Sequence, residues 1–194
     1  MPQPAVPFQP GDEIRGFRVV AVTPVEQLGA MACQFEHVAS GARVLHIFCD
    51  DAENAFTINF PTPPPDDTGM PHILEHMVLA GSEKFPVKEP FFEMVKMSMA
   101  TFINAMTGYD TTYYPVCSNV EQDLFNLADV YFDAVFHPLL TPATFAREAH
   151  HLAPADPADP TGALRLDGIV YSEMKGVFSA PEAILAREAV RKLL

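Results

Sequence analysis

The sequence predicts an α+β protein in which an antiparallel sheet is packed by helices on one side. Two observations predict this class. Residues 16–60 carry a succession of short strand-like runs, which the Pro-rich segment 61–67 ends. From about residue 68 onward, helical patterns alternate with a pair of strand-like runs. Strands that come first and helices that follow are typical of an α+β protein and not of a parallel α/β protein.

β-branched and aromatic residues, bounded by turn-forming residues, mark the expected strands. These strands cover residues 17–22, 31–38, 43–49, 55–60, 101–106 and 111–117. Residues 39–42, with the sequence Ala-Ser-Gly-Ala, predict a hairpin turn between the second and third strands. Residues 107–110 predict a turn between the last two. The segment 61–67 cannot continue a hydrogen-bonded ladder, so it predicts a loop.

Apolar spacing and capping residues mark the expected helices. These cover residues 68–80, 91–99, 120–136 and 142–152, and a last helix from about residue 166 to 194 with an interruption near 176–181. In the first helix, Pro71 lies in the first turn, where its missing N–H is tolerated. Asp66, Asp67 and Thr68 are placed to cap the free N–H groups, and Gly81 is placed to end the helix.

Composition excludes several classes of partner. The chain has 12 basic and 25 acidic residues and a formal charge of −13, so we expect no nucleic acid and no membrane as partners. Three cysteines, few and widely spaced, do not suggest a disulfide framework. The Pro-rich residues 1–12 lack the basic pattern of a leader, which favours a cytoplasmic protein. An organelle matrix, or export after leader removal, is the alternative.

The expected organisation is a loose N-terminal segment at residues 1–15, followed by one catalytic domain at residues 16–194. The sequence stops at residues 190–194 while still in a helical pattern and without a C-cap residue. We therefore expect the domain to be truncated at its C-terminal end.

One short motif carries metal chemistry. His72 and His76 are four residues apart in an expected helix, so both imidazoles lie on one face and can reach one ion. Glu75 shares that face with His72 and can act on a water molecule without being a ligand. The pattern H-x-x-E-H is moderately specific by itself. The alternative is a helix whose histidines are ordinary core or surface residues.

A catalytic zinc site requires a third protein ligand. Glu173 lies 97 residues after His76 (173 − 76), in an apolar helical stretch. Asp167 is the rival, but it stands at the expected helix start, where capping explains it. From the residues alone, Glu173 is equally well explained as a ligand or as a surface glutamate.

Three separated motifs carry a family resemblance. They are His72-Ile-Leu-Glu-His76, the segment Phe102–Tyr114 and the segment Gly168–Gly176. Together they resemble the pitrilysin family of inverzincins, to which the H-x-x-E-H signature belongs. The segment from Pro71 to Phe91 is similar, more narrowly, to the presequence protease branch of that family.

The resemblance implies a set of roles. His72, His76 and Glu173 would bind one Zn²⁺ per chain, and Glu75 would be the general base. Ser172 departs from the usual Asn before the third ligand. Asn104, Ala105 and Thr107 would belong to the edge strand that binds the substrate. The fold implied is the metallohydrolase unit shared by pitrilysin and the processing peptidases.

The activity implied by the resemblance is that of a zinc-dependent endopeptidase, or oligopeptidase, which hydrolyses short unfolded peptides such as targeting presequences. Its partners would be the peptide and a second homologous half of a longer enzyme. One alternative is a catalytically incomplete fragment that binds zinc and peptide and needs the second half. Another is a non-catalytic processing-type subunit, which is less favoured because all four motif residues are present.

The neighbours of the motifs allow further expectations. Tyr113 and Tyr114 are adjacent in an expected strand, so at most one of them faces the site. His150 and His151 are expected to be structural or surface residues. An apolar cluster near the second expected helix favours core packing, with a hydrophobic substrate cavity as the alternative. Its members are Phe91, Phe92, Met94, Met97 and Met99.

Overall fold

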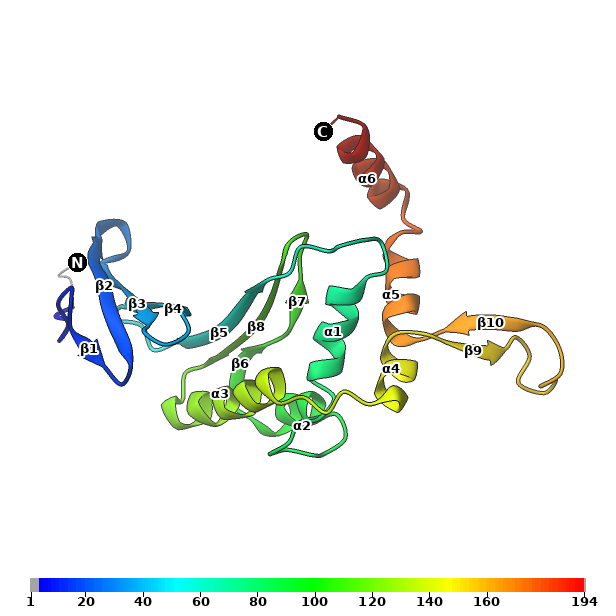
Figure 1. Cartoon of the computed structure of the whole chain (residues 1–194), viewed down its shortest axis with the longest axis horizontal. Helices are drawn as coiled ribbons and strands as arrows, with labels where there is room; N and C mark the ends of the chain where they lie inside the picture. The colour runs from blue at the N-terminus through cyan, green and yellow to red at the C-terminus, as the bar shows by residue number, and fades with distance from the viewer. Residues whose placement is uncertain (1–3, 194) are drawn as a thin grey trace. The chain divides into compact units, whose positions relative to one another are not determined.

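A computed structural model describes residues 4–193 (Figure 1). The chain divides into two compact units, Met1–Ala52 and Glu53–Leu194, here called the N-terminal and C-terminal units. Both contain antiparallel sheets, and the helices belong almost entirely to the C-terminal unit. The α+β class predicted from the sequence is therefore confirmed.

The N-terminal unit is a four-stranded antiparallel sheet with the order β1-β2-β3-β4. Its strands are β1 (Glu13–Ile14), β2 (Phe17–Val25), β3 (Ala30–His37) and β4 (Arg43–Phe48), with the short 3-10 helix η1 (Glu26–Leu28) between β2 and β3. The hairpin predicted at residues 39–42 joins β3 to β4, where the His37 N–H donates to the Ala42 carbonyl. Val19, Ala30 and Cys33 are buried in this unit.

The C-terminal unit is organised around one central strand. Its sheet contains β5 (Asn54–Pro61), β6 (Ala100–Ile103), β7 (Met106–Thr107) and β8 (Thr111–Ser118). β8 pairs with β5 along one edge and with both β6 and β7 along the other. Burial alternates along β8, as the two-residue period of a strand requires, and Tyr114 and Val116 point into the core.

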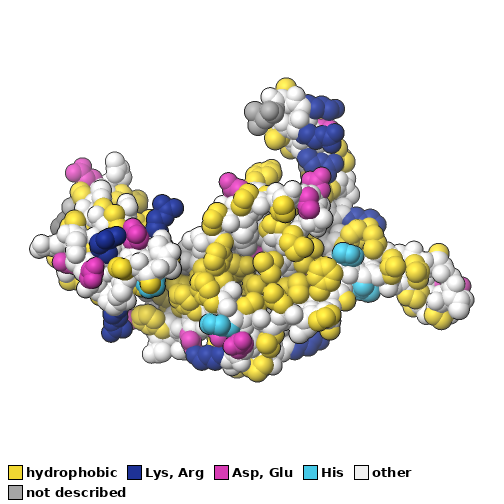
Figure 2. All heavy atoms as spheres, viewed as in Figure 1, with side chains coloured by type: hydrophobic (Ala, Val, Ile, Leu, Met, Phe, Trp, Pro, Cys, Tyr) yellow, Lys and Arg dark blue, Asp and Glu magenta, His cyan; other side chains and the backbone are white. Residues whose placement is uncertain are grey.

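Helices α1 (Met70–Val78), α2 (Pro90–Met97) and α3 (Glu121–Phe136) pack on the face of this sheet that carries Tyr114 and Val116. Leu127, Tyr131 and Ala134 of α3 are almost fully buried there. The sheet packed by helices on one side is therefore present. Figure 2 shows hydrophobic side chains gathered in the middle of this unit.

A second, smaller core joins α1 to α4 (Pro142–Glu148) and α5 (Ile169–Val177). It contains the buried residues Ile73, Met77, Ala149 and Val170, with Met174 packed against them. Burial of an Ile, Met or Val side chain contributes about 1.5–3 kcal/mol. This cluster fixes how α5 lies against α1, and the candidate site depends on that placement.

Residues 151–167 differ from the prediction. The sequence indicated a helix up to Leu152 and another from about Leu166, whereas β9 (His151–Pro154) and β10 (Leu164–Asp167) pair as an antiparallel hairpin. Pairing between these two segments outweighs their local helical pattern. The predicted break near 176–181 is present between α5 and α6 (Pro181–Leu193).

The ends of α1 also differ from the prediction. Gly69, with φ 74°, occupies the N-cap position, and no side chain caps the helix. Asp66 instead accepts a hydrogen bond from the Thr68 N–H, which closes a turn before the helix. The helix ends at Val78, before Gly81.

The apolar cluster near α2 is only partly core. Phe91 and Met94 pack against the main core, as predicted. Phe92, Met97 and Met99 are exposed, so the prediction of core packing is wrong for these three. Among residues 4–193, no helix is both long enough and apolar enough to cross a bilayer.

The start of α5 offers a stability test. Gly168 has φ +154°, and a Cβ there would lie 2.3 Å from the Ala149 carbonyl oxygen and 2.7 Å from His150 Cα. We expect Gly168→Ala to lower the free energy of unfolding by about 2–4 kcal/mol, because backbone must move. Chemical denaturation measures this change.

Gly176→Ala is the matched control, because it lies in the same helix and its Cβ would meet nothing within 4 Å. We expect that substitution to be neutral or to stabilise by up to about 1 kcal/mol. Equal stability of the two variants would contradict the close packing of α5 on the end of α4.

Candidate metal centre

Helix α1 presents two imidazoles one turn apart. The ring centroids of His72 and His76 are 4.9 Å apart, as the four-residue spacing predicts. Ile73 and Met77, the residues that follow each histidine, are buried against α4 and α5. This burial fixes the rotation of α1 about its axis, and the two rings therefore face one point.

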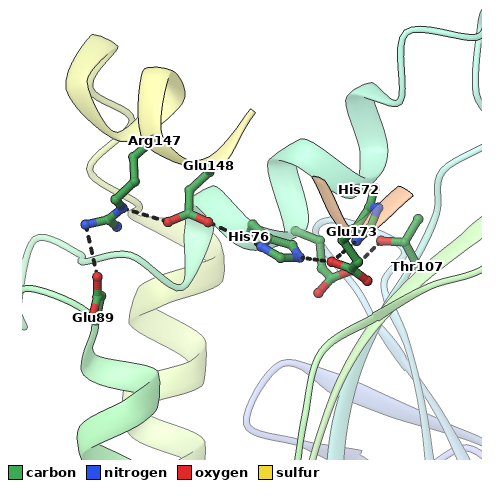
Figure 3. A network of polar contacts seen from close by, with 8 residues as sticks. His72, His76, Glu89, Thr107, Arg147, Glu148 and Glu173 are labelled. Atoms are coloured by element: carbon green, nitrogen blue, oxygen red, sulfur yellow. Dashed lines mark hydrogen bonds and ion pairs between the residues drawn. The ribbon is translucent and has the colours of Figure 1, made fainter. Parts of the chain in front are cut away.

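Glu173 comes to that point from α5 (Figure 3). Its Oε2 lies 3.7 Å from His72 Nε2 and 3.5 Å from His76 Nε2. Within the described residues, these three side chains form one group whose donor atoms all lie within 4.8 Å of one another. The structure thus brings together the three ligands expected from the sequence, and leaves Asp167 outside the group.

The donor set fits a zinc ion. Two imidazole nitrogens and a carboxylate oxygen are common zinc ligands, and tetrahedral bonds of about 2.0–2.2 Å place neighbouring donors roughly 3.3 Å apart. The distances to Glu173 Oε2 exceed this spacing by only a few tenths of an ångström. Three protein ligands leave a fourth position open, which is the arrangement of catalytic sites and not of closed structural ones.

Glu75 lies beside this group and is held separately. It is buried, with 6% of its surface exposed. Thr107 Oγ1, on β7, donates a hydrogen bond of 2.7 Å to Glu75 Oε2. The carboxylate is therefore oriented by the edge strand of the sheet, and it does not belong to the ligand group.

Glu148 is the site residue that sequence reasoning missed. It is buried at the end of α4, and its Oε2 accepts a hydrogen bond from His76 Nδ1 at 3.3 Å. That hydrogen bond raises the pKa of His76 and outweighs the burial that would lower it. Burial raises the pKa of Glu148, but hydrogen bonds from His76 and Arg147 outweigh it, and the net pKa is lowered.

A carboxylate behind a metal-binding histidine fixes the tautomer of the ring. With its Nδ1–H directed at Glu148, His76 presents Nε2 to Glu173. The available signal was a glutamate on the apolar side of the helix predicted at 142–152. The adjacent histidines are not in the ligand group: the His150 ring packs on Phe145, and His151 bonds the Ala146 carbonyl.

The ligands open into a cavity of about 980 Å³. Residues of α1 line the cavity together with the edge-strand segment 104–107, which includes the three expected substrate-binding residues Asn104, Ala105 and Thr107. Phe91 and Phe92 also line it, which supports the cavity alternative for those two. Tyr113 faces the cavity and Tyr114 is buried in the core, as the alternation of a strand predicts.

Hydrogen bonds to β8 and α3 hold the edge-strand segment 104–107 in place. The Asn104 N–H donates to the Pro115 carbonyl of β8, and the Tyr131 hydroxyl of α3 donates to the Asn104 carbonyl at 3.0 Å. Burial of Tyr131 raises the pKa of its hydroxyl, so the group remains a proton donor. In the described part of the chain, no strand pairs with the outer edge of β7.

Fold and site together define a class. The helix carries H-x-x-E-H, the signature of the inverted zincins, a class of metallopeptidases, and Glu173 from a distant helix meets its two histidines. Residues 62–155 match the family described as Insulinase (Peptidase family M16). The chain belongs to this peptidase family, which includes pitrilysin.

Particular relatives are similar over nearly the whole chain. Presequence protease, mitochondrial, from Xenopus laevis is 44% identical over 190 residues, which are 98% of this chain and 18% of the relative. The protein of that name from Mus musculus is 43% identical over the same shares. A crystal structure of pitrilysin matches 66% of this chain and 14% of its own, with a TM-score of 0.58 and 24% sequence identity.

The chain therefore spans about a fifth of the length of these relatives. Their names also correct one prediction. The relatives are mitochondrial proteins, so the cytoplasmic location expected from the sequence is wrong. That prediction rested on the absence of a basic pattern in residues 1–12, and such an absence does not report the compartment.

The ligand set allows a direct test. We expect Glu173→Gln to lower zinc affinity at least about tenfold, because an amide oxygen is neutral and binds zinc poorly. Asp167→Asn is the matched control and should keep full affinity, since Asp167 bonds the Gly168 N–H and pairs with Arg165. Competition with a chromophoric chelator measures both. Unchanged binding by the Glu173 variant would remove this residue from the site.

Proposed function

We propose that this chain carries the metal centre of a zinc-dependent endopeptidase that hydrolyses short unfolded peptides. The observation that carries the proposal is the position of Glu75. Its carboxylate is buried, oriented by Thr107, and lines the same cavity as the His72, His76 and Glu173 group. A purely structural metal site would have no use for a carboxylate held in this way.

The residues divide the chemistry between them. His72, His76 and Glu173 would hold the ion. When bound, zinc supplies Lewis acidity, which polarises a peptide carbonyl and lowers the pKa of a water molecule to about 7. Glu75 takes the proton from that water and later delivers it to the leaving amine. Because Oε2 accepts from Thr107, Oε1 is the oxygen that we propose receives this proton.

Substrate binding would use the outer edge of β7. An extended peptide adds to a free strand edge through main-chain hydrogen bonds. This mode of binding recognises the peptide backbone more than its side chains. Asn104 and Ala105 line the cavity beside that edge, and Phe91 and Phe92 add apolar surface. This arrangement suits unfolded peptides of varied sequence.

Full turnover would require more than this chain. The relatives are about five times as long, and catalysis depends strongly on positioning of the substrate. We propose that a second homologous half encloses the peptide and completes the site. A non-catalytic role is disfavoured because both histidines and both glutamates of the motif are present and converge.

The negative charge of the cavity and of the whole chain favours basic peptides, such as targeting presequences, as substrates. Five acidic side chains line the cavity together with the cation Arg147: Asp67, Glu75, Glu89, Glu148 and Glu173. The whole chain carries a formal charge of −13. A peptide rich in Lys and Arg would be attracted to this surface, and salt would screen the attraction.

Glu75→Gln should lower kcat by about 10²–10⁴-fold while zinc affinity stays within about twofold, because the amide cannot accept the proton. A quenched fluorescent peptide reports turnover, on this chain alone and on the chain joined to downstream sequence from a relative. Glu93→Gln is the control, since Glu93 pairs with Lys96 on the exposed side of α2. Full activity in the Glu75 variant would disprove the mechanism.

Peptide charge provides a separate test. For a peptide rich in Lys and Arg, we expect kcat/KM to fall about fivefold or more between low and high ionic strength. A neutral peptide of the same length should change little. A flat response to both salt and peptide charge would refute basic peptides as the preferred substrates.

A further inference from the structure

Arg147 lies between two carboxylates that belong to different parts of the fold. Its Nε donates to Glu148 Oε1 at 2.8 Å, and its Nη1 lies 3.1 Å from Glu89 Oε1 (Figure 3). Glu148 contacts His76 with its other oxygen. An ion pair and two hydrogen bonds therefore connect Glu89 at the start of α2, through Arg147 and Glu148 at the end of α4, to the candidate metal ligand His76.

We propose that Arg147 and Glu89 are positioning residues of the metal centre, which act through Glu148 on His76 and help to set the zinc affinity. The proposal rests on the proposed function only for the binding of zinc, and not for peptide hydrolysis. Neither residue is among the expected ligands, the base or the substrate strand.

The geometry of Arg147 explains why an arginine is needed. Glu148 must direct its Oε2 at His76. This orientation requires a second group that fixes Oε1 on the other side of the carboxylate. The guanidinium group does this with Nε while it holds Glu89 with Nη1. A lysine keeps the charge but has a single ammonium nitrogen, and it cannot hold two carboxylates from two nitrogens of one rigid planar group.

The backbone at Glu89 supports a positioning role. Glu89 adopts φ 56° and ψ 55° as the N-cap of α2, a left-handed conformation that L-residues disfavour. The following Pro90 disfavours it further. Such conformations persist only where the surrounding structure holds them, and they cluster at functional sites. The ion pair with Arg147 supplies one such restraint.

The pair is also placed where a substrate could reach it. Arg147 and Glu89 both line the cavity, with side chains 32% and 38% exposed, whereas the Glu148 side chain is 9% exposed. An exposed ion pair contributes little to stability by itself. The Arg147–Glu89 pair would act on the metal centre through the buried Glu148. The experiment therefore measures zinc affinity and not the free energy of unfolding.

Zinc affinity, measured by chelator competition, tests the proposal. We expect Arg147→Lys and Arg147→Met each to weaken zinc binding about tenfold, within the range for residues that orient metal ligands. Glu89→Gln should weaken it about threefold in the wild-type background and have no further effect beside Arg147→Met, because the two act in one chain. Arg18→Met, which breaks an ion pair with Glu36 in the N-terminal unit, should have no effect.

A spectroscopic signature separates positioning from simple loss of charge. In two-bond ¹H–¹⁵N spectra of the metal-free chain at alkaline pH, His76 should carry its proton on Nδ1. In Arg147→Lys and Glu148→Ala, the Nε2-protonated form should become populated. Circular dichroism checks that each variant is folded.

Two outcomes would overturn the proposal. One is zinc affinity within twofold of wild type in folded Arg147→Lys and Arg147→Met, and the other is an unchanged His76 tautomer in Glu148→Ala. Failure of the proposed function is a different result: a chain that binds zinc with these dependences and yet, joined to downstream sequence, does not cleave peptides.

Discussion

The packing of α5 against α1 is the constraint on which the candidate site depends. Ile73 and Met77 alternate with the histidines along α1, and they contact Ala149 and Val170. This contact brings Glu173, 97 residues beyond His76 (173 − 76), to 3.5 Å from its ring. Gly168 permits the close approach, because a side chain there would meet the backbone of residues 149 and 150. A small apolar cluster therefore determines whether three donors meet.

The central strand β8 has a comparable part in the other half of the site. It pairs with β7, and so it positions the Thr107 hydroxyl that orients Glu75. The same strand accepts the Asn104 N–H, while Tyr131 of α3 bonds the Asn104 carbonyl. Hydrogen bonds therefore connect the sheet to Glu75, the proposed base. The candidate metal ligands are supported from α4 and α5, whereas Glu75 is supported from the sheet.

Features that depend on short spacing could be predicted from the sequence. The four-residue interval of His72 and His76, the alternation of Tyr113 and Tyr114 and the break before α6 are of this kind. The β9–β10 hairpin was missed because the long segment 155–163 separates its two short strands, in place of a tight turn like that at 39–42. Glu148 was missed for a similar reason, since its partner is 72 residues away. Glu173 was a candidate from the residues alone, and the family resemblance favoured the ligand role over that of a surface glutamate.

Thr107 belongs to the strand proposed to receive a peptide, and its hydroxyl donates the hydrogen bond that orients Glu75, the proposed proton acceptor. If a peptide adds to β7, its scissile bond is selected by register against that strand and not by the identity of a flanking residue. A β-ladder repeats every two residues, so a peptide can advance only in steps of two and keep its hydrogen bonds. Under the proposed function, successive cuts in one extended peptide would then be separated by even numbers of residues.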